Sequence, residues 1–198
     1  MSIRALLFDL DNTLIDRDAA MAEWLATLVP AEHVAPLVTL DHGSYSPRPA
    51  FYSALGAAAG LPAGEARERF AQEMPTLVRL RPDAAELLAR TTLPIIIVTN
   101  GLSQMQRTKV VAAGLEGRVQ GVIVSEEVGS EKPSPGIFRA ALRLVGCTAQ
   151  EAIMIGDHPI NDIAGARSAG IEAVFVRSRW FEPPVGVRAI DKLTELAW

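Results

Sequence analysis

The sequence predicts an α/β fold, in which a parallel sheet is flanked by helices and a small helical domain is inserted after the first strand. Short apolar runs recur along the chain, and they are continuously apolar rather than alternating, as in strands buried on both faces. Helical patterns separate the last four runs, which favours parallel strands joined by right-handed crossovers. The predicted strands are residues 4–10, 93–100, 121–125, 152–157 and 173–177.

The connection after the first strand is long and contains no convincing strand. A structureless segment of this length is improbable in a compact domain, so we expect helices. Proline- and glycine-rich stretches divide it, and a helix starting with "RPDAAELLAR" (81–90) returns to the sheet. The predicted division is therefore a core of residues 1–15 and 82–198 and a helical insertion of residues 16–81. The expected helices of the insertion lie near 18–29, 48–59 and 64–78.

Helix-start and helix-stop residues mark the crossovers of the core. Ser103 is the expected N-cap of a helix that ends near residue 112, just before Gly114. Ser134 is the expected N-cap of a helix over 135–145, with proline at its first position. The segment "NDIAGARSAG" (161–170) begins with residue types that favour helix starts.

Composition restricts the partners and the compartment. The net charge is −4 and no long basic run is present, which argues against nucleic acid as the main partner. No apolar run approaches the ~20 residues that span a bilayer, and "MSIRALLFDLDN" does not resemble a signal peptide. The single cysteine, Cys147, cannot form an internal disulfide, and we expect a structural role for it. We expect a cytoplasmic protein without a membrane partner; the oligomeric state stays open.

Polar residues follow the predicted strands at the points where they end. They belong to one edge of the sheet, because the carboxyl ends of parallel strands meet there and bind ligands. Clustered carboxylates repel and need a cation, and Mg²⁺ binds carboxylate and phosphate oxygens. A metal ion together with a lysine suits a phosphoryl group. The residues are Asp9, Asp11, Thr99, Asn100, Lys132, Asp157 and Asp162.

The segments "FDLDNTL", "VTNG", "EKPSPGIF" and "GDHPINDIAGARSAG" resemble, in order, the four motifs of the haloacid dehalogenase superfamily of hydrolases. The likeness covers residues 4–177. The stretch "DHGSYSPRPAFYSAL" also resembles the cap of the phosphatase branch, whose helical cap follows the first strand. The resemblance implies a Rossmann-like catalytic core with the insertion as its cap.

The same resemblance implies roles for the acidic residues. Asp9 would attack phosphorus and ligate Mg²⁺. Asp11 would protonate the leaving oxygen, then activate water against an aspartyl-phosphate, and its main-chain carbonyl would contact the metal. Asp157 would ligate Mg²⁺. Asp162 would stabilise the metal-binding residues without ligating the ion itself, and it is also suited to cap a helix.

The resemblance assigns phosphate binding to the remaining motif residues. Thr99 and the main chain of Asn100 would hold phosphoryl oxygens, and Lys132 would neutralise both the nucleophile and the phosphate. The implied cofactor is Mg²⁺ and the implied partner is a small phosphorylated metabolite.

The branch of the superfamily follows from single residues. Asp11 disfavours dehalogenation, because haloacid dehalogenases lack this second aspartate. A phosphonatase needs a lysine in its cap, and residues 16–82 contain none. We therefore expect a Mg²⁺-dependent phosphomonoester hydrolase; a phosphomutase and a non-catalytic phosphate-binding protein are the open alternatives.

The insertion offers candidates for substrate recognition. Arg48 is the foremost, because an arginine can clamp a second anionic group. An ion pair with Asp41 is the competing interpretation. For His158 we expect a lining or solvated position rather than catalysis, and for Trp180 a packing role.

Overall fold

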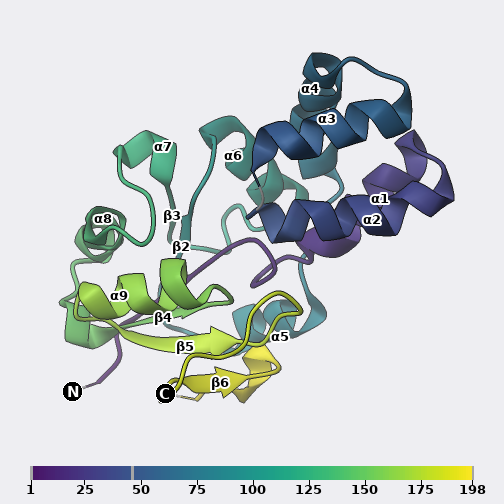
Figure 1. Cartoon of the computed structure of the whole chain (residues 1–198). Helices are drawn as coiled ribbons and strands as arrows, with labels where there is room; N and C mark the ends of the chain where they lie inside the picture. The colour runs from purple at the N-terminus through teal and green to yellow at the C-terminus, as the bar shows by residue number, and fades with distance from the viewer. Residues whose placement is uncertain (1, 46, 198) are drawn as a thin grey trace.

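The computed structural model describes residues 2–45 and 47–197. The two ends of the predicted core, 1 and 198, and Ser46 of the predicted insertion lie outside these residues. Within them the chain forms one six-stranded sheet in the order β3-β2-β1-β4-β5-β6, with all neighbours parallel (Figure 1). The strands are β1 (Ala5–Phe8), β2 (Ile95–Thr99), β3 (Gly121–Val124), β4 (Ala152–Gly156), β5 (Glu172–Val176) and β6 (Arg188–Ile190).

The predicted α/β class, a parallel sheet flanked by helices, and the five predicted strands are confirmed. β6 was not expected, because three residues after a proline-rich loop are too short to show a pattern. Successive side chains of β1 point to opposite faces, so Leu6 and Phe8 belong to one hydrophobic cluster and Leu7 to another. Both faces are covered, which explains the continuously apolar strands.

Helices of the core cover the two faces. α5 (Pro82–Arg90) and α6 (Ser103–Ala112) pack on the face that contains Leu6, and α8 (Pro135–Val145) and α9 (Gly165–Ser168) pack on the face that contains Leu7. A four-residue helix, α7 (Ser125–Val128), follows β3. None of the described helices has the length and hydropathy needed to span a membrane.

Among the described residues, four α-helices lie between β1 and α5, grouped together beside the sheet (Figure 1). Their interior is aromatic: the Trp24 and Phe70 rings meet edge to face at 5.6 Å, and the Phe51 and Phe70 rings at 5.8 Å. Pro36 lies inside the second helix, which was not predicted as a separate element because proline is unfavourable in helix interiors. The helices are α1 (Arg17–Leu28), α2 (Ala31–Asp41), α3 (Arg48–Ala59) and α4 (Ala63–Glu73).

Two helix starts differ from the expectation. Ser103 is the first residue of α6 rather than its cap, and its hydroxyl donates to Glu127 at 2.5 Å. The segment after β4 begins with a π-helical turn, Pro159–Ala164, and His158 caps it by accepting the main-chain N–H groups of Ile160 and Asn161. Asp162 therefore lies inside this turn and does not cap it. The remaining short turns are His42–Ser44, Met74–Thr76, Ala149–Glu151 and Leu193–Glu195.

Candidate active site

The site begins where β1 and β4 end side by side. Phe8 pairs with Ile155, and the main-chain N–H of Asp9 donates to the Ile155 carbonyl at 2.9 Å. This register carries Asp9 to the edge reached by Asp157 at the end of β4. The parallel pairing of two separate motifs thus brings their carboxylates together.

Three carboxylates form one buried cluster. Oxygen atoms of Asp9, Asp157 and Asp162 all lie within 4.8 Å of one another. Asp9 is 5% exposed, and Asp157 and Asp162 are fully buried. Within the described chain, Asp9 Oδ2 and both carboxylate oxygens of Asp157 are buried without a hydrogen-bond partner. Buried, mutually repelling oxygens without donors are the arrangement that a bound cation stabilises.

Lys132 supplies the positive charge in this cluster. Its Nζ donates to Asp9 Oδ1 and to Asp162 Oδ1, each at 2.6 Å. The side chain of Asn100 holds the lysine main chain in place: Asn100 Nδ2 donates to the Lys132 carbonyl at 2.9 Å, and the Lys132 N–H donates to Asn100 Oδ1 at 2.8 Å. The end of β2 therefore positions the segment that carries the lysine.

The pKa values follow from burial and charge. Burial raises the pKa of Asp9 to about 7; Lys132 opposes this shift, and the neighbouring carboxylates add to it. Burial, together with Asp9 and Asp162, raises the pKa of Asp157 well above its usual range. Burial by itself lowers the pKa of Lys132, but the two carboxylates it contacts outweigh burial, and the pKa is raised.

Gly156 makes the close approach of Asp162 possible. A Cβ atom at Gly156 would lie 2.4 Å from the carboxyl carbon of Asp162. Asp162 Oδ2 also accepts the His158 N–H at 2.9 Å. The glycine at the end of β4 thus leaves room for the carboxylate that supports Lys132.

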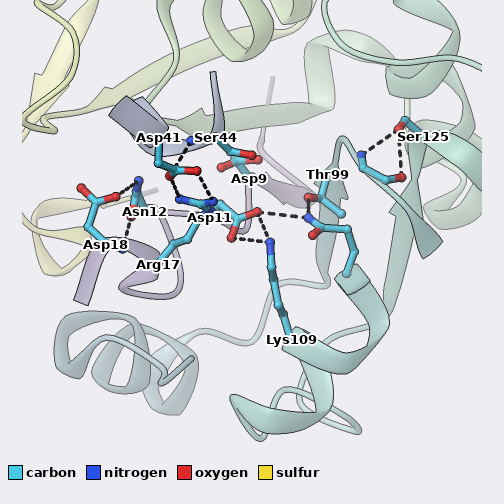
Figure 2. A network of polar contacts seen from close by, with 12 residues as sticks. Asp9, Asp11, Asn12, Arg17, Asp18, Asp41, Ser44, Thr99, Lys109 and Ser125 are labelled. Atoms are coloured by element: carbon cyan, nitrogen blue, oxygen red, sulfur yellow. Dashed lines mark hydrogen bonds and ion pairs between the residues drawn. The ribbon is translucent and has the colours of Figure 1, made fainter. Parts of the chain in front are cut away.

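The Asp11 side chain points to a second buried lysine, Lys109 (Figure 2). Lys109 Nζ donates to Asp11 Oδ1 at 2.9 Å and to Oδ2 at 2.7 Å. Gln106 Nε2 donates to Asp11 Oδ2 at 3.2 Å and also to the hydroxyl of Thr99. Asp11, Thr99 and one face of α6 therefore form a single hydrogen-bonded group.

The surroundings of Asp11 favour its charged form. Burial raises the pKa of Asp11, but Lys109, Arg17 and the hydrogen bond from Gln106 outweigh burial and lower it. Burial lowers the pKa of Lys109, and the contact with Asp11 opposes this shift. Each group of the pair depends on the other for its charge.

A cavity of about 180 Å³ joins the two lysine-bound aspartates. It brings together Asp9, Asp11, Thr99, Asn100 and Lys132, which the sequence assigned to catalysis and phosphate binding. Predicted Asp157 and Asp162 do not line it; they lie buried beside Asp9. The cavity is also lined by Gly43, Ser44, Tyr45 and Asn161.

Aromatic contacts join the insertion to the core above this cavity. The His42 ring stacks on Trp180 at 4.9 Å, and Tyr45 packs edge-on against His158 at 4.4 Å. Trp180 Nε1 also donates to Asp18 at 2.7 Å. His158 thus caps a helical turn and lies in an aromatic cluster. Trp180 packs against the insertion, which agrees with the packing role predicted for it from the sequence.

In this structure Arg48 forms the ion pair with Asp41 that was the competing interpretation. Its Nη2 donates to Asp41 Oδ1 at 2.8 Å, and Arg17 donates to both oxygens of the same carboxylate. Burial raises the pKa of Asp41, but the two arginines outweigh burial and lower it. Arg48 nevertheless lines a larger cavity beside the one just described.

The sequence interpretation missed Lys109 and Gln106. A signal was present: the chain has lysine only at 109, 132 and 192, and Gln106 and Lys109 are three residues apart on one helix. This spacing places both on one face of α6. It did not reveal that this face meets the end of β1.

Comparison with known proteins agrees with the fold and the motifs. The sequence model of the haloacid dehalogenase-like hydrolase family matches residues 6–176. The structure is similar to that of YfnB, a hydrolase of this family from Bacillus subtilis crystallised with magnesium, with a TM-score of 0.83, 25% identity, and coverage of 98% of this chain and 97% of that one.

Two curated relatives are phosphatases. A phosphoserine phosphatase from Thermus thermophilus is 43% identical over 131 residues, which are 64% of this chain and 52% of the relative. A glyceraldehyde 3-phosphate phosphatase from Methanopyrus kandleri is 38% identical over 104 residues, 52% of this chain and 41% of the relative. The chain thus matches about half the length of these relatives.

Proposed function

This chain belongs to the haloacid dehalogenase-like hydrolase family, and we propose that it is a Mg²⁺-dependent phosphomonoester hydrolase that acts through an aspartyl-phosphate on Asp9. The observation that carries the proposal is the charge arrangement around Asp9. One carboxylate oxygen is held by Lys132, the other has no partner in the described part of the chain, and two further carboxylates lie beside it. An acceptor for a phosphoryl group needs this combination of an oriented nucleophile and nearby positive charge.

The residues present fit a divalent cation. The unpartnered oxygens of Asp9 and Asp157 are hard ligands of the kind that Mg²⁺ binds. The Asp11 main-chain carbonyl would be the third ligand supplied by the protein. When bound, the ion supplies charge neutralisation for the carboxylates and for the phosphoryl oxygens. Asp162 would keep Lys132 oriented rather than contact the ion.

The protein's own groups would carry out the transfer. Asp9 forms a bond to phosphorus while the ester oxygen leaves. Asp11, which is ionised and bonded to Lys109 in this structure, must first take up a proton and turn from Lys109, and it then donates that proton to the leaving oxygen. In the second step the Asp11 carboxylate removes a proton from water, and the water oxygen displaces Asp9 from phosphorus. Thr99, the Asn100 main chain and Lys132 would hold the phosphoryl oxygens, since all three line the cavity of about 180 Å³.

We propose the insertion, residues 16–81, as a cap whose contacts choose the leaving group of a small phosphorylated metabolite. Support comes from the relatives: one is named for phosphoserine and another for glyceraldehyde 3-phosphate. The second aspartate, Asp11, supports ester hydrolysis over dehalogenation. The cytoplasmic location stays a prediction, based on a single cysteine.

The experiment is hydrolysis of p-nitrophenyl phosphate and a panel of metabolite phosphates, with Mg²⁺ or with a chelator. Asp9→Asn is expected to lower kcat by about 1,000-fold or more, because the nucleophile is lost. Asp191→Asn is the matched control, since this carboxylate is exposed and belongs neither to the carboxylate cluster nor to the lining of the cavity. Equal turnover by the wild type and Asp9→Asn would contradict the proposal. Transfer of the phosphoryl group to a second sugar position rather than to water would identify a mutase.

A further inference from the structure

A second, larger cavity of about 800 Å³ adjoins the phosphoryl cavity. The two share Asp11, Ser44 and Asn100, so a phosphoryl group in the smaller cavity would direct its leaving group into the larger one. The walls come from the insertion on one side and from α6 and the end of β2 on the other. Tyr52 and Phe70 give the cavity an aromatic wall.

The larger cavity carries an excess of positive charge. Four cationic side chains line it, against the two carboxylates Asp11 and Glu131. Asp41 does not line the cavity, but it pairs with two arginines among these cations. Three carboxylates therefore offset the four cations. Among the described residues at this wall, the cations outnumber the carboxylates by one. The four cations are Arg17, Arg48, Arg67 and Lys109.

Arg67 is exposed and forms no hydrogen bond or ion pair among the described residues. The hydrogen bonds of the other three cations show which of the less exposed ones is available. The Lys109 ammonium donates hydrogen bonds to Asp11. Arg17, which is 1% exposed, donates two N–H groups to Asp41. Among the described residues, Arg48 bonds only through Nη2, and its Nε and Nη1 are shielded from solvent without an acceptor there. Shielded donors without acceptors are unfavourable.

The rings beside Arg48 do not supply the acceptors. Its Cζ lies 5.1 Å from the Phe51 ring centroid and 5.8 Å from that of Phe70. Such contacts use the face of the guanidinium, whereas its N–H groups point outward in the plane. The side chain is 28% exposed, and Asp41 keeps both bonds from Arg17 if Arg48 turns toward the cavity.

Resting on the proposed hydrolase function, we infer that the preferred substrate carries a second anionic group on its leaving group, a carboxylate or a second phosphate, which Arg48 binds in the larger cavity. The anion supplies acceptors for the unbonded N–H groups and balances the excess charge. Tyr52 and Phe70 pack against the carbon skeleton between the two anionic groups.

The first test compares matched esters with the wild-type enzyme. Phosphoserine is paired with phosphoethanolamine, and 3-phosphoglycerate with glycerol 3-phosphate, so that each pair differs at a carboxylate. Ribulose 1,5-bisphosphate is paired with ribulose 5-phosphate for the phosphate arm. In at least one arm, kcat/KM of the more acidic ester is expected to exceed that of its partner by about 10- to 100-fold.

The second test is Arg48→Met, which keeps length and apolar packing but removes the donors. The preference for the acidic ester is expected to fall to about 1, because the neutral ester does not use Arg48. Arg69→Met is the matched control: it removes an arginine of similar exposure on α4 that binds Glu73 and lines neither cavity. It is expected to keep the preference.

The outcomes separate the two proposals. Turnover with a ratio near 1 in every wild-type pair would overturn the anion site and leave the hydrolase function standing. A preference that survives in a folded Arg48→Met variant would also overturn it. If p-nitrophenyl phosphate and all esters stay intact, the proposed function fails, and this inference fails with it. Should Arg48→Met not fold, the wild-type ratios decide.

Discussion

The ion pair between Lys109 and Asp11 should be tightly coupled, and a double-mutant cycle can measure the coupling. The two side chains are 4% and 16% exposed, and both Asp11 oxygens bond to Nζ. Removing one partner of a buried pair costs about 3–5 kcal/mol, because the other charge stays buried alone. Asp11→Asn leaves the more buried ammonium with only an amide oxygen, so we expect a loss of about 3 kcal/mol.

Lys109→Met should cost less, about 2 kcal/mol, because Asp11 retains the bond from Gln106 and some contact with solvent. For a chain of this length, 2 kcal/mol corresponds to a fall in Tm of about 4–8 °C. In the double variant neither charge is left alone, so the combined loss should be smaller than the sum by about 2 kcal/mol.

Urea unfolding followed by circular dichroism, with a chelator and with Mg²⁺, gives the four free energies of unfolding. Arg107→Met is the control on the same helix, since its pair with Glu127 is exposed; it should change stability by less than about 1 kcal/mol. Additive losses from Asp11→Asn and Lys109→Met would refute the coupling and the reasoning about these buried charges.

Two further predictions concern buried charges and close packing. Asp41→Asn should destabilise the fold by about 3 kcal/mol at pH 7, because Arg17 is left buried without its counter-charge. Since the pKa of Asp41 is lowered in the folded state, this contribution is present above the unfolded pKa of about 3.9 and is lost as the pH falls through the folded value; unfolding at pH 7 and pH 3 should therefore show a smaller difference between wild type and variant at pH 3. Gly156→Ala should cost about 1–3 kcal/mol, because its Cβ would meet the Asp162 carboxyl group at 2.4 Å. Gly64→Ala is the control in the same thermal unfolding assay, because a Cβ there would meet no described atom within 4 Å beyond its own helix backbone and chain neighbours; equal Tm values for the two variants would contradict the packing argument.

The sequence predicted most of the sheet because buried parallel strands are continuously apolar, and β1 and β4 end abruptly in aspartates. It also grouped the polar strand ends correctly, since parallel strands must present those ends at one edge. It could not give the partner of Asp11, because helical periodicity shows which face of α6 carries Lys109 but not which strand end that face meets.

The insertion was harder to predict for a related reason. Its helices pack on one another through Trp24, Phe51 and Phe70, but apolar periodicity does not specify which helices become neighbours. The junction between His42 and Trp180 joins residues far apart in the chain. Such a contact follows from tertiary packing and leaves no local pattern.

The central claim is that the buried carboxylates of Asp9 and Asp157, beside the Asp162 carboxylate that holds Lys132, form a site for one divalent cation. Calorimetric titration of the wild-type chain with MgCl₂ tests it most directly, with Asp157→Asn as the variant and Asp191→Asn as the control. Asp157→Asn removes one of three repelling charges and should still fold. The account predicts one Mg²⁺ per chain for the wild type and for Asp191→Asn, and binding at least about 10-fold weaker for Asp157→Asn. Equal affinity in all three proteins, or no Mg²⁺ bound by the wild type, would contradict it.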